Sequence, residues 1–287
     1  MEFFLLAGGY GMRARPLSIV RPKPVFPLNN EPLINIMLRQ LKQNNLKSGY
    51  INLHYLPEKL KELIDTELDI KYILEDKLSG SAVLSTIDNI ANNYILIING
   101  DVFLDIPIEG LYENIKKTGA DGILLIRNDN EKKYSKLEIK DNSFIGIAKE
   151  NNNYTKMYGG VAIFKREVLK GFIHKSFFTS LKKNSFDIKT LEYNGIWIDL
   201  GSPRQYYDGC FKYDRYIGKK SKNIIVQSTS QSKNTRVQNS IIWDNVKLLN
   251  NTSVKNSIIL DNTIIDNLDI SNKIVYTHEG KLTLIEL

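Results

Sequence analysis

The sequence predicts an α/β protein whose Rossmann-like sheet is mixed but mostly parallel and flanked by helices, followed by a short C-terminal parallel β-helix. Three patterns predict this fold. Apolar strands alternate with amphipathic helices in the first third of the chain, a glycine-rich turn follows the first strand, and the last quarter contains a repeated segment. Sheets built from alternating strands and helices are parallel with right-handed crossovers, and they bind ligands at the carboxyl ends of their strands.

The first strand is an apolar run at 3–7, and the glycine-rich turn follows it directly. Apolar residues then recur at helical spacing from 32 to about 44, where Asn44 and Asn45 are expected to end the helix. Further strands are expected at 49–55, 71–74 and 94–98, and further helices at 57–64 and 81–91. Pro57 suits a first helical turn, where the missing N–H is not needed.

The region 120–215 mixes strands with short helices and loops, which is typical of an α/β domain with an antiparallel portion. The strands are expected at 122–126, 137–139, 161–164 and 196–198. The sequence changes character near 219, where short β-branched runs and Asn-Ser pairs begin to dominate. We therefore expect a catalytic domain at 1–218 and a β-helix domain at 219–287.

The second domain contains a repeat. Residues 237–245 (VQNSIIWDN) return 17 positions later as 254–262 (VKNSIILDN). Asn-Ser turns between short β-branched runs, once per coil, predict a parallel β-helix in which each coil buries its aliphatic face on its neighbours. The domain has room for about three coils and a closing segment at 281–287. Two similar hairpin strands are the alternative, because only two clear repeats are present.

The composition narrows the class of function. The net charge is +7 and the isoelectric point about 9.1, but the basic residues are spread along the chain, which argues against nucleic-acid binding. The one cysteine, Cys210, cannot form an internal disulfide and is expected to be an inert thiol in a reducing compartment. The apolar start is too short for a signal peptide, and no run is long enough to span a membrane. We expect a cytoplasmic protein with neither a membrane nor a nucleic-acid partner.

The glycine-rich turn carries groups that suit a polyphosphate. Gly8, Gly9 and Gly11 allow successive N–H groups to face one anion, and Arg13 and Lys23 add a guanidinium fork and a point charge. Five of the eight prolines follow, at 16, 22, 24, 27 and 32, so a long stiff loop is expected. Neither a dinucleotide fingerprint nor a Walker loop is present. For the glycines alone, an ordinary turn after a buried strand is an equally good interpretation.

This stretch resembles the signature of sugar-1-phosphate nucleotidyltransferases, the pyrophosphorylases that make nucleotide sugars. Their pattern runs L-A-G-G-x-G-T-R-L-x-P-L-T, then P-K-P, a further proline and P-L-I. Residues 6–17, 22–24, 27 and 32–34 match it, with departures at 12, 14 and 18. Asp101 in N-G-D and Asp199 in W-I-D-L-G-S-P-R-Q-Y match two further patterns of the family. The repeat resembles the left-handed β-helix appended to several pyrophosphorylases.

The resemblance implies that a sugar 1-phosphate attacks the α-phosphorus of a nucleoside triphosphate and that pyrophosphate leaves. It implies that Arg13 stabilises the pyrophosphate, that Lys23 bridges the α-phosphate and the sugar phosphate, and that Asp101 and Asp199 hold Mg²⁺. These four are the implied catalytic residues. The implied nucleotide-binding residues are Leu6, Ala7, Gly8, Gly9, Gly11, Arg13, Glu75, Gly80 and Ser81.

Residues 75–82 (EDKLSGSA) resemble the family turn E-x-x-P-L-G-T-A, which approaches the nucleotide. Glu75 either accepts hydrogen bonds from a purine or caps its own turn, and both interpretations stay open. Gly160 lies in a strand that resembles the family's A-G-x-Y-x-F. The family's preceding Glu-Lys-Pro is replaced here by KEN at 149–151, so Glu150 is assigned to a sugar hydroxyl and Lys149 to the sugar phosphate. The implied sugar-phosphate-binding residues are Lys23, Lys149, Glu150 and Gly160.

The favoured substrates are GTP and mannose 1-phosphate or a related sugar phosphate, because the chain resembles mannose-1-phosphate guanylyltransferase-like proteins best. UTP-, ATP- or dTTP-dependent transfer to another hexose 1-phosphate is an alternative, and so is a non-catalytic regulatory subunit that binds nucleotide sugars. A glycosyltransferase is disfavoured because Asp101-Val102-Phe103 lacks the second aspartate of an Asp-x-Asp site. A β-helix acyltransferase is disfavoured because His278 falls after the last repeat. A homo-oligomer formed through the β-helix is compatible with the sequence.

Overall fold

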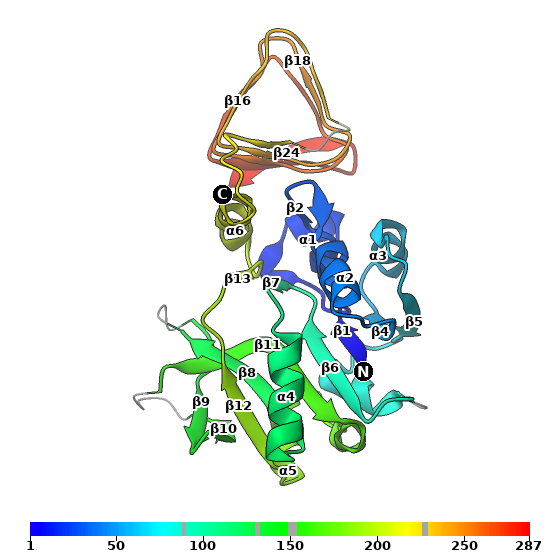
Figure 1. The fold of residues 1–287 in the computed structure, drawn as a ribbon. Helices are drawn as coiled ribbons and strands as arrows, with labels where there is room; N and C mark the ends of the chain where they lie inside the picture. Colours follow the sequence, from blue (N-terminus) through cyan, green and yellow to red (C-terminus); the bar gives the residue numbers. More distant parts are fainter. Residues whose placement is uncertain (88–89, 130–132, 149–153, 226–228) are drawn as a thin grey trace. The chain divides into compact units, whose positions relative to one another are not determined.

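The computed structural model describes the chain except residues 88–89, 130–132, 149–153 and 226–228 (Figure 1). The chain divides into two compact units, and neither is continuous in sequence. The first unit comprises Met1–Gly9, Met37–Glu58 and Asp65–Trp197, and the second comprises Tyr10–Ile36, Lys59–Ile64 and Ile198–Leu287. Among the described residues, no helix combines the length and the apolar character needed to cross a membrane.

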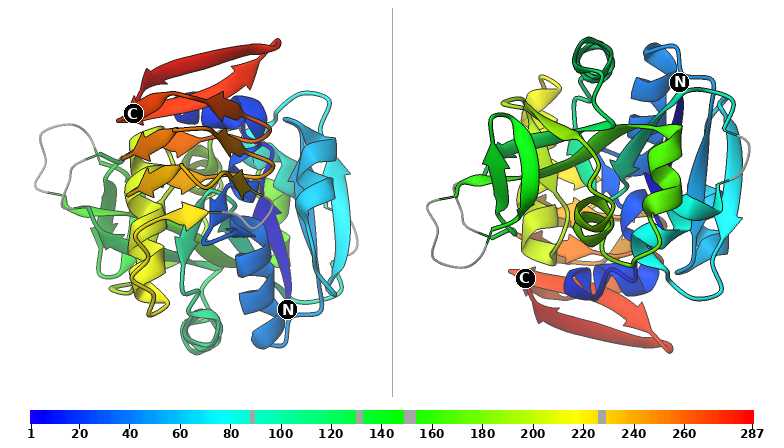
Figure 2. Two further views of the ribbon diagram at one scale, coloured as in Figure 1. Left: turned by 90° about the horizontal axis from the view of Figure 1, so that it is seen from above. Right: turned by 90° about the horizontal axis from the view of Figure 1, so that it is seen from below.

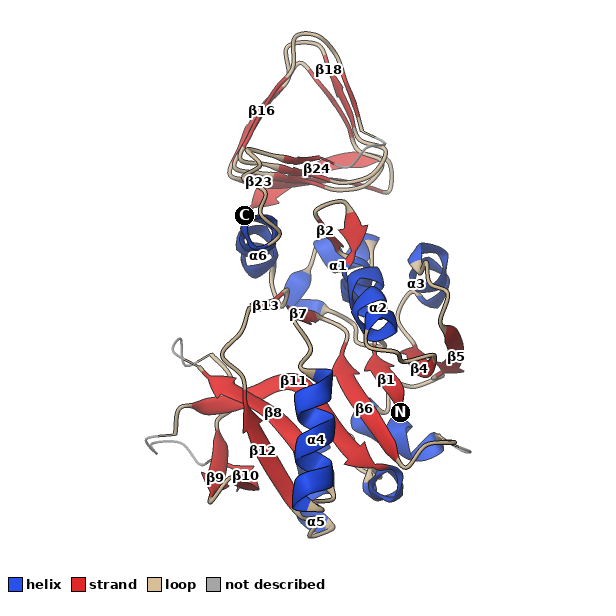
Figure 3. Ribbon diagram, viewed as in Figure 1, coloured by secondary structure: helices blue, strands red, loops and turns tan. Residues whose placement is uncertain are grey.

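A nine-stranded mixed sheet forms the first unit, in the order β5-β4-β1-β6-β11-β8-β12-β10-β9 (Figure 3). Its strands are β1 (Glu2–Leu6), β4 (Ser48–Leu53), β5 (Asp69–Leu74), β6 (Tyr94–Asn99), β8 (Gly122–Asn128), β9 (Leu137–Lys140), β10 (Ser143–Ile147), β11 (Lys156–Lys165) and β12 (Ile188–Glu192). The neighbours β5, β4, β1 and β6 are parallel, whereas β11 is antiparallel to both β6 and β8. The predicted parallel series and the antiparallel portion are both confirmed.

Helices and the core complete the first unit. Helix α4 (Ile108–Thr118) packs on β8 and β11 through Ile108, Leu111 and Ile115. A core cluster joins residues of the sheet, such as Phe4 and Phe164, to residues of short helical segments. Those segments are η3 (Gly80–Thr86), η4 (Arg166–Gly171) and α5 (Phe177–Lys183). The remaining elements are α2 (Leu33–Gln43) and α3 (Pro57–Leu63), which have residues in both units, and the short strands β7 (Val102–Leu104) and β13 (Trp197–Asp199).

The predicted helix at 81–91 is wrong. The 3-10 helix η3 occupies the first part of this range, and residues 88–89 lie outside the described residues. Ser85 Oγ donates to the Ala82 carbonyl at 2.8 Å, and Thr86 Oγ1 donates to the Val83 carbonyl at 2.7 Å. Side chains that bond to a carbonyl three residues back compete with the α-helical pattern and fit the tighter 3-10 turn.

The second unit contains the proline-rich loop, helix α6 (Pro203–Tyr216) and a three-sided β-helix, drawn as the triangle in Figure 1. The loop forms η1 (Met12–Ala14), α1 (Leu17–Val20), η2 (Lys23–Val25), β2 (Pro27–Leu28) and β3 (Glu31–Pro32). None of these segments is longer than four residues, as expected for a chain interrupted by prolines. Ser202 caps α6 by accepting a hydrogen bond from Gln205 N, and Pro203 occupies its first turn.

Three sheets of parallel strands form the faces of the β-helix, and Figure 2 shows their coils stacked on one another. The strands are β14 (Ile224–Ile225), β17 (Ile241–Ile242), β20 (Ile258–Ile259) and β23 (Lys273–His278) on one face, β15 (Ser230–Gln231), β18 (Lys247–Leu249) and β21 (Ile264–Asp266) on another, and β16 (Arg236–Gln238), β19 (Ser253–Lys255) and β22 (Asp269–Ser271) on the third. This parallel pairing confirms the predicted β-helix and excludes the pair of hairpin strands. Strand β24 (Lys281–Glu286) runs antiparallel to β23 and forms the predicted closing segment.

Asparagines form one corner of each coil. Asn239, Asn256 and Asn272 have φ angles of 47°, 49° and 57°, in the left-handed region that asparagine tolerates better than most residues. Their amides form a ladder, Asn239 to Asn256 at 3.4 Å and Asn256 to Asn272 at 3.2 Å. Aliphatic residues such as Ile242, Ile259 and Val275 fill the interior. The Asn-Ser repeat therefore encodes corners, and the β-branched runs encode the core.

Candidate functional site

Several predicted residues of the first unit lie at the edge of the sheet where β1 and β6 end. Leu6 is paired with Asn99, and Gly100 N donates to the Leu6 carbonyl at 2.9 Å. Asp101 therefore follows immediately beyond this edge. Gly160 lies beside the same strand end, at an irregularity in the pairing of β11 with β8. It has φ +91°, and a Cβ on it would lie 3.5 Å from Asn99 Cβ. Leu6, Asp101 and Gly160 therefore all lie near the carboxyl end of β6.

A buried amide ties the glycine turn to the neighbouring strands. Asn52 Oδ1 accepts a hydrogen bond from Ala7 N at 2.6 Å, and Asn52 Nδ2 donates to Glu75 Oε1 at 2.6 Å. Gly8 is buried here, and a Cβ on it would lie 2.7 Å from Asn52 Nδ2. Asn52 was not among the predicted site residues, although an asparagine late in an otherwise apolar strand was a usable signal.

Glu75 caps its own turn. Its Oε2 accepts hydrogen bonds from Ser79 N at 3.0 Å and from the Ser79 hydroxyl, while Oε1 accepts from Asn52. Gly80 follows with φ +62°, packed against the backbone at Lys175, and the Ser81 hydroxyl donates to the His174 carbonyl at 2.9 Å. The structure thus supplies a structural reason for all three residues, and their contact with a nucleotide stays a prediction.

In the second unit, the loop brings Gly11 and Lys23 together. Gly11 has φ +63°, and a Cβ on it would lie 2.9 Å from Ser18 Cβ and 3.3 Å from Lys23 Cγ. The Ser18 hydroxyl donates to the Gly11 carbonyl at 2.8 Å. Lys23 is 8% exposed, so most of its side chain is covered. Arg13 is exposed on η1, within the same loop.

Asp199 lies just before α6 in the second unit and is 9% exposed. Gln205 Nε2 donates to Asp199 Oδ2 at 3.0 Å. A Cβ on Gly201 would lie 2.8 Å from Oδ2 and 3.0 Å from Oδ1 of Asp199. The W-x-D-x-G pattern therefore needs its glycine because the aspartate side chain folds back over that position.

The other predicted residues are placed as follows. Ala7 is buried at the end of β1 and Gly9 is exposed in the turn. Lys149 and Glu150 lie outside the described residues. Cys210 is buried on α6, and burial raises the pKa of its thiol far above the ordinary value, so the thiol stays protonated. This environment confirms the expectation of an inert structural thiol.

Trp197, the first residue of the W-x-D pattern, organises an aromatic cluster in the first unit. Its Nε1 donates to the Gly159 carbonyl at 3.0 Å, and the Arg127 guanidinium lies 4.7 Å from the centre of its ring. Tyr134 packs edge-on against the same indole at 5.4 Å. Burial lowers the pKa of Arg127. Tyr193 interacts electrostatically with Arg127, and burial raises the pKa of its hydroxyl to about 12. The sequence did not indicate Arg127.

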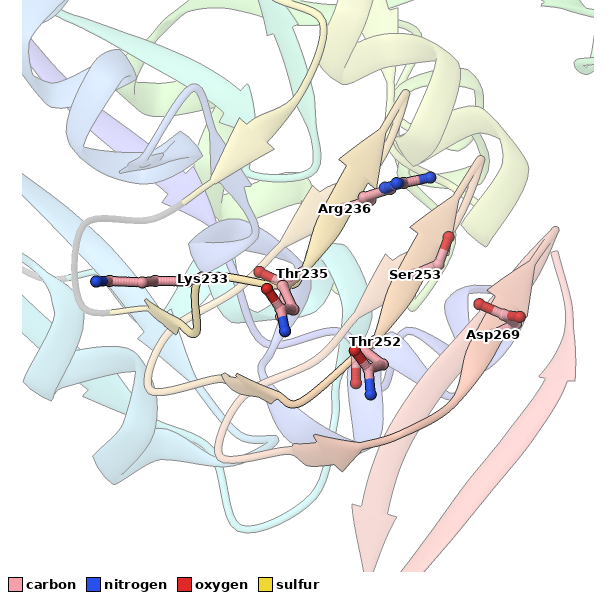
Figure 4. A pocket seen from close by; sticks show the side chains of 8 residues that line it. Lys233, Thr235, Arg236, Thr252, Ser253 and Asp269 are labelled. Carbon is pink, nitrogen blue, oxygen red and sulfur yellow. The ribbon is translucent and has the colours of Figure 1, made fainter.

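Two further features of the described residues concern metal ligands and a pocket away from the predicted site residues. Among the described residues, no three His, Cys, Asp or Glu side chains cluster in a way that could hold a metal ion by themselves. A polar pocket of about 660 Å³ lies on the β-helix, between the turns of successive coils (Figure 4). Its lining residues are Lys233, Asn234, Thr235, Arg236, Asn251, Thr252, Ser253 and Asp269.

Comparison with known proteins identifies the family. Residues 4–215 match the model of the nucleotidyl transferase family. The chain is 25% identical over 252 residues to a mannose-1-phosphate guanyltransferase from Hypocrea jecorina, covering 80% of this chain and 68% of the relative. It is 26% identical over 221 residues to a D-glycero-alpha-D-manno-heptose 1-phosphate guanylyltransferase from Campylobacter jejuni, covering 72% of this chain and 97% of the relative. Other curated relatives are covered over 60% or 52% of their length.

Solved structures share the fold. HddC from Yersinia pseudotuberculosis is similar with a TM-score of 0.63 at 20% sequence identity, over 74% of this chain and 99% of that one. At this level of identity the likeness concerns the architecture of the sheet and its helices. The family model spans the glycine-rich turn, Lys23, Asp101 and Asp199, which is most of the chain before the β-helix. The chain therefore belongs to the nucleotidyl transferase family.

Proposed function

We propose that this chain is a sugar-1-phosphate nucleotidyltransferase, which joins a sugar 1-phosphate to a nucleoside triphosphate and releases pyrophosphate. The observation that carries the proposal is the loop in which Gly11 packs on the stem of Lys23, in a chain of the nucleotidyl transferase family. A glycine with positive φ leaves backbone N–H groups free to turn toward an anion, and a lysine beside it adds a point charge. That combination suits a triphosphate.

The proposed substrates are GTP and a sugar 1-phosphate of manno configuration. The names of the Hypocrea and Campylobacter relatives share two features, a guanylyl group and a manno-configured sugar. These names support guanosine as the base and mannose 1-phosphate, or a closely related sugar phosphate, as the acceptor. Transfer from UTP, ATP or dTTP is the outcome that would redirect the assignment.

Two cations handle the phosphates in this proposal. Arg13, exposed on the loop, binds the β- and γ-phosphates that leave as pyrophosphate, and its planar fork matches phosphate oxygens. Lys23 contacts both the α-phosphate and the incoming sugar phosphate. The sugar phosphate dianion is already nucleophilic, so the chain needs no general base. Catalysis rests on positioning and on neutralisation of charge.

The donors present fit Mg²⁺. Asp101 and Asp199 offer hard carboxylate oxygens, and Mg²⁺ is commonly bound by one or two carboxylates together with substrate phosphates. Gly201 supports this assignment because any larger residue there would press on the Asp199 carboxylate. When bound, Mg²⁺ neutralises charge on the reacting phosphates. Asp101 and Asp199 would hold the ion, and Gln205 fixes the orientation of the Asp199 side chain.

A pyrophosphate-release assay tests the function. The full chain is incubated with Mg²⁺, each of GTP, UTP, ATP and dTTP, and a panel of hexose and heptose 1-phosphates. We expect release with GTP and a manno-configured sugar phosphate, and a loss of about 10²- to 10³-fold in Lys23→Ala, comparable to removing a preorganised transition-state donor. Asp208→Asn, which removes only an exposed ion pair on α6, is the matched control and should leave the rate unchanged.

Two results would count against the proposal. Nucleotide-sugar binding without any turnover would indicate the non-catalytic regulatory subunit. Full activity in Asp101→Ala or Asp199→Ala would remove these residues from the reaction. Lys149→Ala and Glu150→Ala, assayed for KM of the sugar phosphate, test the sugar-binding residues, and Glu75→Gln and Ser81→Ala test those for the nucleotide.

A further inference from the structure

Arg21 is buried inside the second unit, two residues before Lys23. Its Nε donates to Asp261 Oδ2 at 2.6 Å and its Nη2 donates to Asp261 Oδ1 at 2.6 Å, a bidentate pairing. Nη2 also donates to Asp244, and the guanidinium lies 5.1 Å from the centre of the Trp243 ring. The Arg21 side chain is only 3% exposed. An arginine of the phosphate-binding loop is thus held by the β-helix.

The two carboxylates occupy equivalent positions in successive coils. Asp244 and Asp261 are the next-to-last residues of the two copies of the repeat, 17 residues apart, and Asp244 N donates to Asp261 Oδ1 at 3.0 Å. Like charges stacked this closely repel unless a cation lies between them. Burial alone would lower the pKa of Arg21, but the hydrogen bonds and charges of Asp261 and Asp244 outweigh it and raise the pKa. Arg21 therefore stays charged and paired.

A second contact attaches the loop on the other side of Lys23. Trp243 Nε1 donates to Tyr206 Oη at 2.8 Å, and Tyr206 Oη donates to the Pro27 carbonyl at 2.8 Å. Phe26 packs against both rings, with centroids 5.3 Å from Tyr206 and 5.4 Å from Trp243. Between the two attachments lies the short segment Pro22–Val25, in which two prolines restrict the backbone. Its conformation is therefore fixed at both ends.

We infer that the β-helix positions Lys23 for the reaction, through the Asp244/Asp261–Arg21 pairing and the Trp243–Tyr206 contact. The inference rests on the proposed function, in which Lys23 contacts the reacting phosphates. In this arrangement Arg21, Asp261 and Trp243 are positioning residues, and the β-helix is a working part of the transferase site. A misplacement of a catalytic group by about 1 Å is enough to cost a factor near 10² in rate.

Asp261→Asn is the first test. The substitution keeps the size of the side chain and one acceptor oxygen but removes the charge and the bidentate pairing. We expect kcat to fall by about 10- to 100-fold, with KM for the nucleoside triphosphate changed by less than about threefold. In a Lys23→Ala background the same substitution should change kcat by less than about threefold, because residues that act through one another are not additive. Glu286→Gln, which removes an exposed ion pair elsewhere on the β-helix, is the control.

Two further measurements keep the inference separable from the fold and from the proposed function. Trp243→Phe removes the N–H donor to Tyr206 and part of the ring area that packs on Phe26 and Arg21, and it replaces Asp261→Asn if that variant does not fold. The rate of chemical modification of Lys23, followed by mass spectrometry, does not depend on turnover. We expect it to rise by at least about threefold in Asp261→Asn, because loosening of the Pro22–Val25 segment would expose Lys23, which is only 8% exposed in the structure, and to stay unchanged in Glu286→Gln.

The outcomes separate the positioning role of the β-helix from the proposed function. An unchanged modification rate for Lys23, or an equal loss of kcat in the wild-type and Lys23→Ala backgrounds, overturns the positioning role. A wild-type chain that releases no pyrophosphate with any substrate pair counts against the proposed function, while the modification rate still decides how Lys23 is held. A Lys23→Ala variant with full activity overturns both. Lower thermal stability with unchanged kcat reduces the β-helix contact to a purely structural one.

Discussion

Single residues set the shape of the proposed metal site. Gly201 leaves space that the Asp199 carboxylate fills, because a Cβ there would lie 2.8 Å from Oδ2. Gly201→Ala should therefore displace the carboxylate, raise the Mg²⁺ concentration needed for half-maximal pyrophosphate release by about tenfold or more, and change stability little. Gly110→Ala is the matched control, since its Cβ would meet nothing nearer than 4.0 Å. An unchanged Mg²⁺ dependence would separate Asp199 from the metal.

Asp129 gives a pH dependence of stability. Burial would raise the pKa of its carboxyl, but Lys136 and the N–H of Tyr134, at 2.9 Å, outweigh burial and lower it. The pairing then stabilises the folded state fully above the unfolded pKa of about 3.9, and this contribution disappears as the pH falls through the lowered folded pKa. Asp129→Asn should cost about 1–3 kcal/mol at pH 7, and the difference from wild type should shrink below about pH 4. Urea unfolding at several pH values measures it, and a difference that grows in acid would contradict the sign.

Spacing in the sequence predicted the residues of the loop but not the residues that hold it in place. Lys23 and Gly11 were predicted because the glycines, the arginine and P-K-P lie close together in sequence, and the structure confirms that Gly11 and Lys23 are neighbours. Asn52 and Arg21 could not be predicted in the same way. Asn52 bonds to Ala7, 45 positions away, and Arg21 bonds to Asp261, 240 positions away. A polar residue beside an apolar run shows that a partner is needed without showing which one.

At the scale of elements, the β-helix was predicted well because its coils repeat the same local chemistry. A period of 17 residues, shortened to 16 in the last coil, places aliphatic residues inside and asparagines at corners. The segment 81–91 failed for the opposite reason. Its apolar spacing indicates a helix, but hydroxyl groups of Ser85 and Thr86 bond to carbonyls three residues back and select a 3-10 turn. Hydrophobic periodicity does not register such local competition.

The asparagine corners make a prediction about the β-helix as an element. Asn256 has φ 49° and takes part in the amide ladder with Asn239 and Asn272. Asn256→Ala should lower the free energy of unfolding by about 1–2 kcal/mol, because alanine resists positive φ and cannot continue the ladder. Asn256→Gly keeps the backbone conformation and loses only the ladder, so it should cost about half as much. Chemical denaturation of both variants checks this, and equal losses would exclude backbone strain as the cause.

At the scale of the whole molecule, the compact units are discontinuous in sequence. The second unit combines 10–36 and 59–64 with 198–287. Contacts such as Tyr206 with Pro27, 179 positions apart, create this arrangement. No pattern within the loop or within α6 indicates that the other is its neighbour, so a change of sequence character near 219 was the only boundary that could be predicted. The domain limits 1–218 and 219–287 stay a prediction about continuous segments.

The second unit should consequently unfold as one body. Phe26 belongs to the loop and is fully buried against Tyr206 and Trp243. Phe26→Ala should cost about 3–5 kcal/mol, as large-to-small substitutions of buried aromatic residues do. In a Trp197→Phe background, Trp243 is the single tryptophan and reports on the β-helix. Its fluorescence transition should move to lower denaturant in Phe26→Ala, as it should in Ile259→Ala within the coils. A Trp243 transition that is unchanged in Phe26→Ala but shifted in Ile259→Ala would mean that the coils fold without the loop.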